Sequence, residues 1–475
     1  MAENELFNIC SNCHVDFKKY GLCLDVTRQK YFKNTCDLIC EIEENNIRLK
    51  HLRMVSGEVV NCSEKRQALH TSLRSFSAFS PMFETVNIER ERILNFAVRV
   101  RNGEWCGCGG DVITDVINIG IGGSDMGPRM VYQALRESNP KIRLHFLSTV
   151  DGHLLTRILD VCNPFTTLVV VSSKSFKTRE TLPNARAVDH WFAEAGITGS
   201  KRIHHIVVAS ANPSAAKIMH LPQANQFYFW DWVGGRFSVW GAVGLPLAIT
   251  LGPEVFLELL HGAEDMDRHS IEAPIEKNLP ATLALLAYWN IRKLGIKSHC
   301  VLPYDERLRV MVPWLQQLEM ESLGKKSQDS DQLTGQLVWG ANGNEGQHSF
   351  YQWLREGTDR SSIDLILCEK ANHRYPEHHR VLIANAKAQA EALVTRPNPE
   401  EFYNALTVIT IDELTPRRLG ALMAMYEHKT TMLGSLLGIN PFDQPGVELG
   451  KKLSLRVEQG EDPQKALQEI ISPSA

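Results

Sequence analysis

Five polar segments of this chain carry residue types that could hold a phosphate group and move a proton beside it. One of them surrounds a glutamate, and all five are rich in glycine, hydroxyl, cationic or carboxylate groups: 120–124 (GIGGS), 173–178 (SKSFKT), 234–238 (GGRFS), 320–325 (MESLGK) and 442–451 (FDQPGVELGK). Backbone N–H groups, hydroxyls and cations bind phosphate oxygens, and a carboxylate can act as a general base. The sequence therefore predicts anion binding next to proton transfer.

The glycine-rich segment follows an apolar run at 112–120, which predicts a buried strand, and precedes a predicted helix at 125–138. Gly120, Gly122, Gly123 and Ser124 would let the backbone approach an anion at the start of that helix. A tight turn required only by packing would explain the same glycines. The segment lacks both the full dinucleotide fingerprint and a Walker lysine, so nucleotide binding is disfavoured.

The second segment lies between a predicted strand at 166–172 and a predicted helix at 179–195. It gathers the hydroxyls of Ser173, Ser175 and Thr178 with the amine of Lys174. Capping a helix needs only one hydroxyl, so this concentration favours a cradle for a phosphate monoester over capping alone. We expect two strand ends of one sheet to share one anion.

The candidates for chemistry are charged or polar residues that, taken singly, also suit ordinary structural roles. Arg236 beside two glycines could stabilise negative charge, or it could be a common ion-pair residue. Glu321 lies near the end of a predicted helix, with Gln317 on the same face. It could act as a base, or it could be an ordinary solvated side chain. His348 is expected at the start of another helix, where it could be structural. Lys451 follows a glutamate by three residues, which could form an exposed ion pair.

Alternating strands and helices are expected to position these segments. Further strands are predicted at 144–150 and 204–211, and a second series follows: helix 281–294, strand 298–303, helix 308–324, strand 337–340, helix 347–356 and strand 363–368. Such alternation predicts parallel, doubly wound α/β sheets. A chain of 475 residues exceeds one hydrophobic core, so two domains are expected.

The overall composition limits the partners. A net charge of -4 offers no general attraction to nucleic acid or membrane surfaces. The longest apolar run, at 239–253, is broken by glycines and a proline, so no transmembrane helix is expected. The N-terminus resembles neither a secretion signal nor a transit peptide, which predicts a cytoplasmic protein. Eleven cysteines suit reduced thiols. The pair at 10 and 13 has C-x-x-C spacing but the pair at 106 and 108 does not, so the two C-x-x-C pairs of a zinc ribbon are not present and no metal is expected.

Two long stretches carry a resemblance to a known family: 231–244 (DWVGGRFSVWGAVG) and 434–451 (GSLLGINPFDQPGVELGK). Together with 61–70 and the segments above, they make the chain similar to the glucose-6-phosphate isomerase (phosphoglucose isomerase) family. The resemblance implies an α/β fold of two doubly wound sugar-isomerase (SIS-type) domains with a C-terminal helical arm. The expected parts are a largely helical N-terminal segment (1–78), a smaller domain (79–250), a larger domain (251–440) and the arm (441–475).

The resemblance also implies an activity and a set of roles. The reaction would be the reversible isomerisation of glucose 6-phosphate and fructose 6-phosphate, in glycolysis and gluconeogenesis, by a homodimer without a cofactor. The implied phosphate-binding residues are Gly123, Ser124, Ser173, Lys174, Ser175 and Thr178, and the implied sugar-contacting and catalytic residues are Arg236, Gln317, Glu321, His348, Gln444 and Lys451. His348 would come from the partner subunit.

These residue types fit the chemistry. Opening the sugar ring asks for proton transfer at the ring oxygen and the anomeric hydroxyl, which suits His348 with Lys451 nearby. Glu321 would then carry a proton between C2 and C1 through a cis-enediol or enediolate that Arg236 stabilises.

The chain departs from the family at Ser175 and Lys177, where threonine is common, and at Leu323, where asparagine is common. None of these changes removes a proposed catalytic group. One alternative is a related isomerase that also accepts mannose 6-phosphate. Another alternative is a regulator that senses sugar phosphates. The joint presence of the proposed catalytic residues argues against this alternative.

Overall fold

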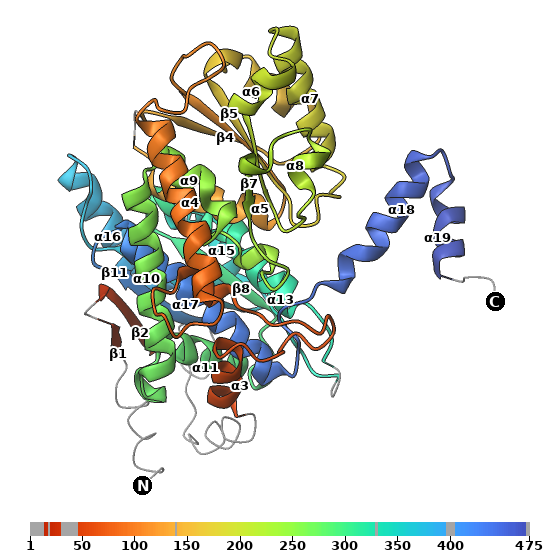
Figure 1. The fold of residues 1–475 in the computed structure, drawn as a ribbon. Coiled ribbons are helices and arrows are strands. Elements are labelled where there is room, and N and C mark those ends of the chain that lie inside the picture. The colour runs from red at the N-terminus through yellow and green to blue at the C-terminus, as the bar shows by residue number, and fades with distance from the viewer. Residues whose placement is uncertain are drawn as a thin grey trace.

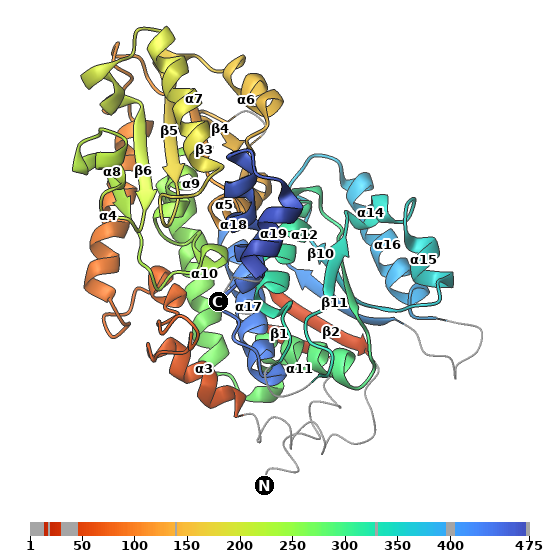
Figure 2. The same cartoon turned by 90° about the vertical axis from the view of Figure 1, so that its right-hand side faces the viewer.

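The computed structural model describes residues 14–17, 20–29, 46–137, 140–327, 331–395 and 404–471. Two separate sheets, each flanked by helices, form the body of the molecule, and a C-terminal helical arm projects from it (Figures 1 and 2). Within the described ranges, no helix is both long and apolar enough to cross a bilayer. The predicted α/β class with two doubly wound sheets is confirmed.

The smaller sheet has five parallel strands in the order β4-β3-β5-β6-β7. Their bounds are β3 Asp115–Ile119, β4 Arg143–Leu147, β5 Thr167–Ser172, β6 Ile206–Ser210 and β7 Gln226–Tyr228. Four of these strands were predicted, with ends shifted by a few residues, and β7 was missed because three residues carry little pattern. β3, β5 and β6 are buried along their whole length, as expected of parallel strands covered on both faces.

The larger sheet has six strands in the order β1-β2-β11-β10-β8-β9. Their bounds are β1 His14–Phe17, β2 Leu22–Arg28, β8 Ser298–Pro303, β9 Leu337–Gly340, β10 Ser361–Cys368 and β11 Ala405–Ile411. Strands β8 to β11 pair in parallel, and β2 joins β11 antiparallel. The sheet is therefore mostly parallel, in agreement with the sequence prediction.

The expectation that residues 1–78 are largely helical is wrong for the described part of its start. Residues 14–17 and 22–28 are strands that extend the larger sheet. Leu22, Leu24 and Val26 are buried while their neighbours are less so, a period-two pattern that fits one covered strand face. Among the described residues, the first helix is α3 (Ile47–Val55). The other proposed domain boundaries stay predictions.

Helices cover both sheets and meet in the middle of the molecule. Their bounds, after α3, are α4 Phe83–Arg101, α5 Gly123–Leu135, α6 Gly152–Leu159, α7 Thr181–Glu194, α8 Ala215–Ile218, α9 Leu245–Thr250, α10 Pro253–Glu272, α11 Leu279–Arg292, α12 Met311–Leu315, α13 Glu321–Leu323, α14 Gly343–Gly346, α15 Tyr351–Glu356, α16 Pro376–Ala392, α17 Pro416–Leu437, α18 Glu448–Glu458 and α19 Pro463–Ile471. Thr415 caps α17, since its side chain accepts a hydrogen bond from the Arg418 N–H.

Helices α10 and α17 form the central pair. A Cβ at Gly262 would lie 1.8 Å from the Arg417 carbonyl oxygen, and one at Gly420 would lie 2.0 Å from the Leu259 carbonyl oxygen. Only glycine permits this approach. Helix α17 is buried over most of its length, including the charged side chains Glu427, His428 and Lys429.

Two predicted helices differ in detail. The predicted helix at 308–324 is found as α12, a π-helical turn at Gln316–Met320 and α13 in succession. The helix predicted at 347–356 begins later, at Tyr351, so His348 lies in the turn between α14 and α15. The rings of Phe350 and Tyr351 fill the space beside Gly346 and end α14 there.

Candidate active site

The phosphate-binding candidates lie where the order of the smaller sheet reverses. β3 and β5 are parallel neighbours, and their chain connections leave in opposite directions along the sheet, to β4 and to β6. In open α/β sheets, ligands bind at the carboxyl ends of the strands at such a point. The turn at 120–124 follows β3, and the loop at 173–178 follows β5. The two segments are therefore brought together, as the sequence predicted.

The glycine turn is pressed against the segment that carries Arg236. A Cβ added at Gly123 would lie 1.9 Å from the Gly235 carbonyl oxygen and 2.7 Å from the Arg236 nitrogen. Gly122 has φ of +60°, and a Cβ there would lie 2.9 Å from Nε2 of Gln317. Because these two glycines have no Cβ, the start of α5 can contact both the segment that carries Arg236 and the segment that carries Glu321.

The loop after β5 folds around its own hydroxyls. Ser173 Oγ lies 3.1 Å from Thr178 Oγ1 and accepts a hydrogen bond from the Phe176 N–H. Ser175 is exposed and accepts a hydrogen bond from the Lys177 N–H. The Phe176 side chain is buried although its φ is +55°, so it holds the loop on the domain core. The clustered hydroxyls can rotate to meet an anion.

Lys174 has a tethering role that its sequence context did not predict. Its Nζ donates to the carbonyl oxygens of Asp231 and Val233, at 2.7 and 2.9 Å. Burial lowers its pKa, and Arg66 nearby adds to the shift. The side chain ties the 173–178 loop to the segment before Arg236, and its predicted contact with substrate remains a prediction.

Arg236 and Glu321 face each other across the site. Arg236 Nη1 lies 3.4 Å from Glu321 Oε2 and donates to Gln444 Oε1 at 2.6 Å. Its Nε donates to Ser322 Oγ at 2.7 Å, and its Nη2 donates to the Pro441 carbonyl oxygen at 2.6 Å. Burial lowers the pKa of Arg236, while the Glu321 carboxylate opposes that shift. The guanidinium is thus oriented on every edge, which suits a fixed positive charge.

Gln317 and Glu321 share one side of their helical segment, as the spacing predicted. Gln317 Nε2 donates to Glu321 Oε1 at 3.2 Å. The two residues are joined through the π-helical turn at Gln316–Met320, a form of helix that is frequent at functional sites. Glu321 is partly exposed, so its carboxylate can meet a substrate.

A polar network behind Arg236 was missed by sequence reasoning. Lys325 Nζ donates to Asp443 Oδ1 at 2.6 Å, and Asp443 Oδ2 accepts hydrogen bonds from Ser63 and Asn440. Asn440 Nδ2 also donates to Asn61 Oδ1 at 2.9 Å. These residues come from three distant stretches, so no local pattern could join them. The network fixes the 440–444 loop that delivers Gln444.

A cavity of about 1180 Å³ adjoins the site at Glu321 and Gln444. It extends toward α3 and is lined there by Lys50, Arg53 and Ser63. The hydroxyls of the 173–178 loop do not line it. The contact of Gly122 with Gln317, rather than this cavity, relates the Glu321 segment to the glycine turn, and Lys174 ties the 173–178 loop to the segment before Arg236.

Two predicted catalytic residues are not joined to this cluster within one protomer. His348 is exposed in the turn after α14, on the connection that follows β9 of the larger sheet. Lys451 lies on the projecting helix α18 and pairs with Glu448 at 2.8 Å, with both side chains more than half exposed (Figure 1). The described part of the chain shows no hydrogen bond or ion pair between either residue and Glu321 or Arg236.

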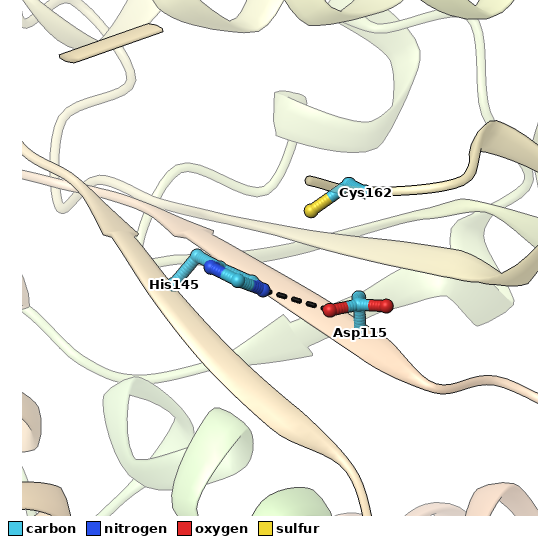
Figure 3. A group of neighbouring side chains, drawn as sticks. All are labelled: Asp115, His145 and Cys162. Atoms are coloured by element: carbon cyan, nitrogen blue, oxygen red, sulfur yellow. Dashed lines mark hydrogen bonds and ion pairs between the residues drawn. The ribbon is translucent and has the colours of Figure 1, made fainter. Parts of the chain in front are cut away.

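Outside the site, Asp115, His145 and Cys162 form a group of metal-ligand type (Figure 3). Asp115 is already engaged by His145 Nε2 and by Arg143 Nε, both at 2.8 Å. Burial raises the pKa of the Cys162 thiol to about 12, which disfavours a thiolate ligand. Asp115 accepts hydrogen bonds from His145 and Arg143, so we interpret these side chains as an ion-paired link between β3 and β4.

Of the two cysteine pairs considered in the sequence, Cys106 and Cys108 lie among the described residues. Cys106 donates to the Gly103 carbonyl oxygen in a turn, and the Cys108 N–H donates to His205 Nε2 at 2.9 Å. Cys10 and Cys13 lie outside the described residues.

The fold, with a glycine turn and a hydroxyl-rich loop at the carboxyl ends of β3 and β5 and a carboxylate–arginine pair beside them, is that of an α/β sugar-phosphate isomerase. A sequence profile of the phosphoglucose isomerase family matches residues 25–472. The chain belongs to this family, whose reaction is the interconversion of glucose 6-phosphate and fructose 6-phosphate.

Individual relatives agree. The glucose-6-phosphate isomerase of Burkholderia multivorans is 43% identical over 467 residues, covering 93% of this chain and 86% of the relative. Glucose-6-phosphate isomerase 1 of Chromohalobacter salexigens is 39% identical over 454 residues, covering 91% and 83%. The crystal structure of a glucose-6-phosphate isomerase from Chlamydia trachomatis is similar with a TM-score of 0.83 at 27% identity, covering 98% of this chain and 96% of that one.

Proposed function

We propose that Glu321 is the base that moves a proton between C2 and C1 of glucose 6-phosphate and fructose 6-phosphate, while Arg236 stabilises the enediolate oxygen. The observation that carries this assignment is the 3.4 Å approach of Arg236 Nη1 to Glu321 Oε2. When the carboxylate removes a proton from the sugar, negative charge develops on the enediolate oxygen. A buried, fixed cation beside the carboxylate stabilises that charge as it forms. Gln317 and Gln444 orient these two groups.

The phosphate is held at a distance from the reacting carbons. Gly123, Ser124, Ser173, Ser175 and Thr178 bind it at the carboxyl ends of β3 and β5. Two observations support phosphate binding by these residues. The first N–H groups of α5 have no side-chain cap and can donate to an anion, and the hydroxyls of the 173–178 loop lie close together. Binding the unreactive dianion positions the sugar without taking part in the proton transfer.

Ring opening falls to a histidine from a second copy of the chain. His348 is exposed and makes no contact with Glu321 in its own protomer, which favours a role across a subunit interface. It lies on the connection that leaves the carboxyl end of β9, and connections at that edge of α/β sheets commonly carry functional groups, which supports this role. Lys451, on the projecting arm, is the proposed second group for this step. The active form is then a homodimer, and its location is cytoplasmic, which free cysteines such as Cys62 suit.

Glu321→Gln tests the proposed base. We expect turnover of fructose 6-phosphate to fall by roughly 10²- to 10⁴-fold, the range for loss of a positioned general base. The KM should change little, because the phosphate contacts remain. Unchanged kcat in this variant would reject the assignment.

Subunit complementation tests the shared site. Glu321→Gln and His348→Ala should each be inactive, but a mixed dimer of the two carries one site with both native residues if His348 acts across the interface. Random assembly then restores roughly one quarter of native activity, since half of the dimers are mixed and each has one intact site. If His348 acts within its own subunit, the mixture stays inactive.

A further inference from the structure

A buried ion pair lies directly behind the helical segment that carries Glu321. Lys429 Nζ of α17 donates to Glu319 Oε1 at 2.7 Å. The two side chains are only 2% and 6% exposed. Glu319 belongs to the π-helical turn at Gln316–Met320, two residues before Glu321. This pair takes no part in the proton transfer proposed above.

The position of the pair relates it to Glu321. Residues two apart on a helix point roughly 200° apart at 3.6 residues per turn, so Glu319 faces the core when Glu321 faces the site. Their exposures agree, since Glu319 is buried and Glu321 is partly exposed. A π-helical turn is a rare departure from the α-helix and needs support from its surroundings. Lys429 supplies that support at the turn itself.

We propose that Lys429 and Glu319 form a positioning pair that holds the π-helical turn in register and keeps a neutral electrostatic environment behind Glu321. This inference rests on the proposed role of Glu321 as the base. The other contacts of α13 do not replace the pair. Arg236 holds Ser322, and Leu323 packs with the apolar side chains of α17, but both lie after Glu321 in the chain.

The charges around both glutamates define what the pair does. Around Glu319, the nearby groups are Lys429, Tyr426 and Asp364, and Tyr426 donates to Asp364 at 2.8 Å. Asp364 is also paired with His299 at 3.2 Å. Among the described residues, Lys429 is therefore the cation in direct contact with Glu319.

On the front side, Glu321 faces Arg236 and Lys325, and Asp443 pairs with Lys325. A buried charge is weakly screened by solvent, so a change on Glu319 or Lys429 reaches Glu321. The sign of the charge change then sets the direction of the effect on proton transfer.

Two single variants change this charge in opposite senses. Lys429→Met leaves a negative charge behind Glu321, which disfavours the ionised base, so the acid limb of the kcat/KM profile moves to higher pH. Glu319→Gln keeps an oxygen acceptor for Lys429 but removes a negative charge, so the same limb moves to lower pH. The double variant removes both charges and returns the limb toward its native position. We expect kcat to fall at least tenfold in Lys429→Met, with a KM change below about threefold.

Arg417→Met is the matched control. Arg417 lies on the same helix and holds the buried Asp265 at 2.7 Å, but it is twelve residues away, about 18 Å along the helix. Its loss should lower Tm without shifting the pH profile.

The experiment is the pH dependence of kcat and KM for fructose 6-phosphate in the native enzyme, both single variants, the double variant and the control. Opposite shifts of the two single variants support the inference. Shifts no larger than that of Arg417→Met, with only Tm lowered, overturn it. If Lys429→Met does not fold, the Glu319→Gln shift decides alone. If Glu321→Gln is inactive but the variants at Lys429 and Glu319 leave the pH profile unshifted, only the positioning pair is rejected. Full activity in Glu321→Gln rejects the base itself.

Discussion

Replacing Gly123 by alanine should separate the two halves of the active site. The added Cβ would lie 1.9 Å from the Gly235 carbonyl oxygen, and ordinary contact begins at 3.4 Å, so α5 and the Arg236 segment must move apart by 3.4 − 1.9 = 1.5 Å. Both sides of this contact are backbone, so a rotamer change cannot relieve it. Misplacing a reacting group by about 1 Å can cost ~10²-fold in rate. We therefore expect kcat/KM to fall by about two orders of magnitude.

The assay is the conversion of fructose 6-phosphate, followed through a coupled dehydrogenase, together with thermal unfolding. Overpacking of this kind typically costs about 1–3 kcal/mol, so Tm should fall as well. Gly152→Ala is the matched control, because Gly152 is likewise the first residue of a helix in the smaller domain but has no atom within 4 Å of its added Cβ. Native kcat/KM in Gly123→Ala would refute the proposed contact between phosphate turn and catalytic arginine.

Three further predictions follow from the same structure. Ser173→Ala combined with Thr178→Val should raise the KM for fructose 6-phosphate by about tenfold or more while kcat falls less, because these hydroxyls hold the unreactive phosphate; an unchanged KM in steady-state kinetics would contradict the cradle. Burial lowers the pKa of His51 to about 3 and that of His269 to about 4, from 6.5, so their contribution to stability is complete above pH 6.5 and is lost as the pH falls toward those values. Tm should therefore fall on acidification through this range and less steeply in His51→Gln, and parallel Tm curves for the two proteins would count against this. Lys451→Met should lower kcat whereas Lys452→Met, its exposed neighbour on α18, should not; equal activities would remove Lys451 from the mechanism.

The meeting of the glycine turn with the 173–178 loop was predictable from the sequence because its signals are local. Strand, glycine turn and helix follow one another at Gly120 to Ser124, and hydroxyls cluster at Ser173 to Thr178. Parallel strands place their carboxyl ends at one edge, so the two segments had to meet if β3 and β5 were neighbours. The direction of the Lys174 side chain depends on residues 231–233 and had no local signal.

The catalytic half depends on contacts between distant residues. Arg236, Glu321 and Gln444 are separated by 85 and more positions. Their own segments made Arg236 and Glu321 candidates, but only the resemblance to a family joined the three in one site. The π-helical turn and the Glu319–Lys429 pair follow from tertiary packing against α17, which the periodicity of 308–324 does not encode. The N-terminal strands were misjudged because β2 is stabilised by pairing with β11, at the far end of the described chain.

The central claim, that Glu321 carries the proton between neighbouring carbons, is tested most directly by isomerisation in deuterated water. Native enzyme converting fructose 6-phosphate should place deuterium at C2 of the glucose 6-phosphate formed, because the base exchanges its proton with solvent. Glu321→Gln should bind the substrate and incorporate almost none. Incorporation by Glu321→Gln at the native rate would contradict the account.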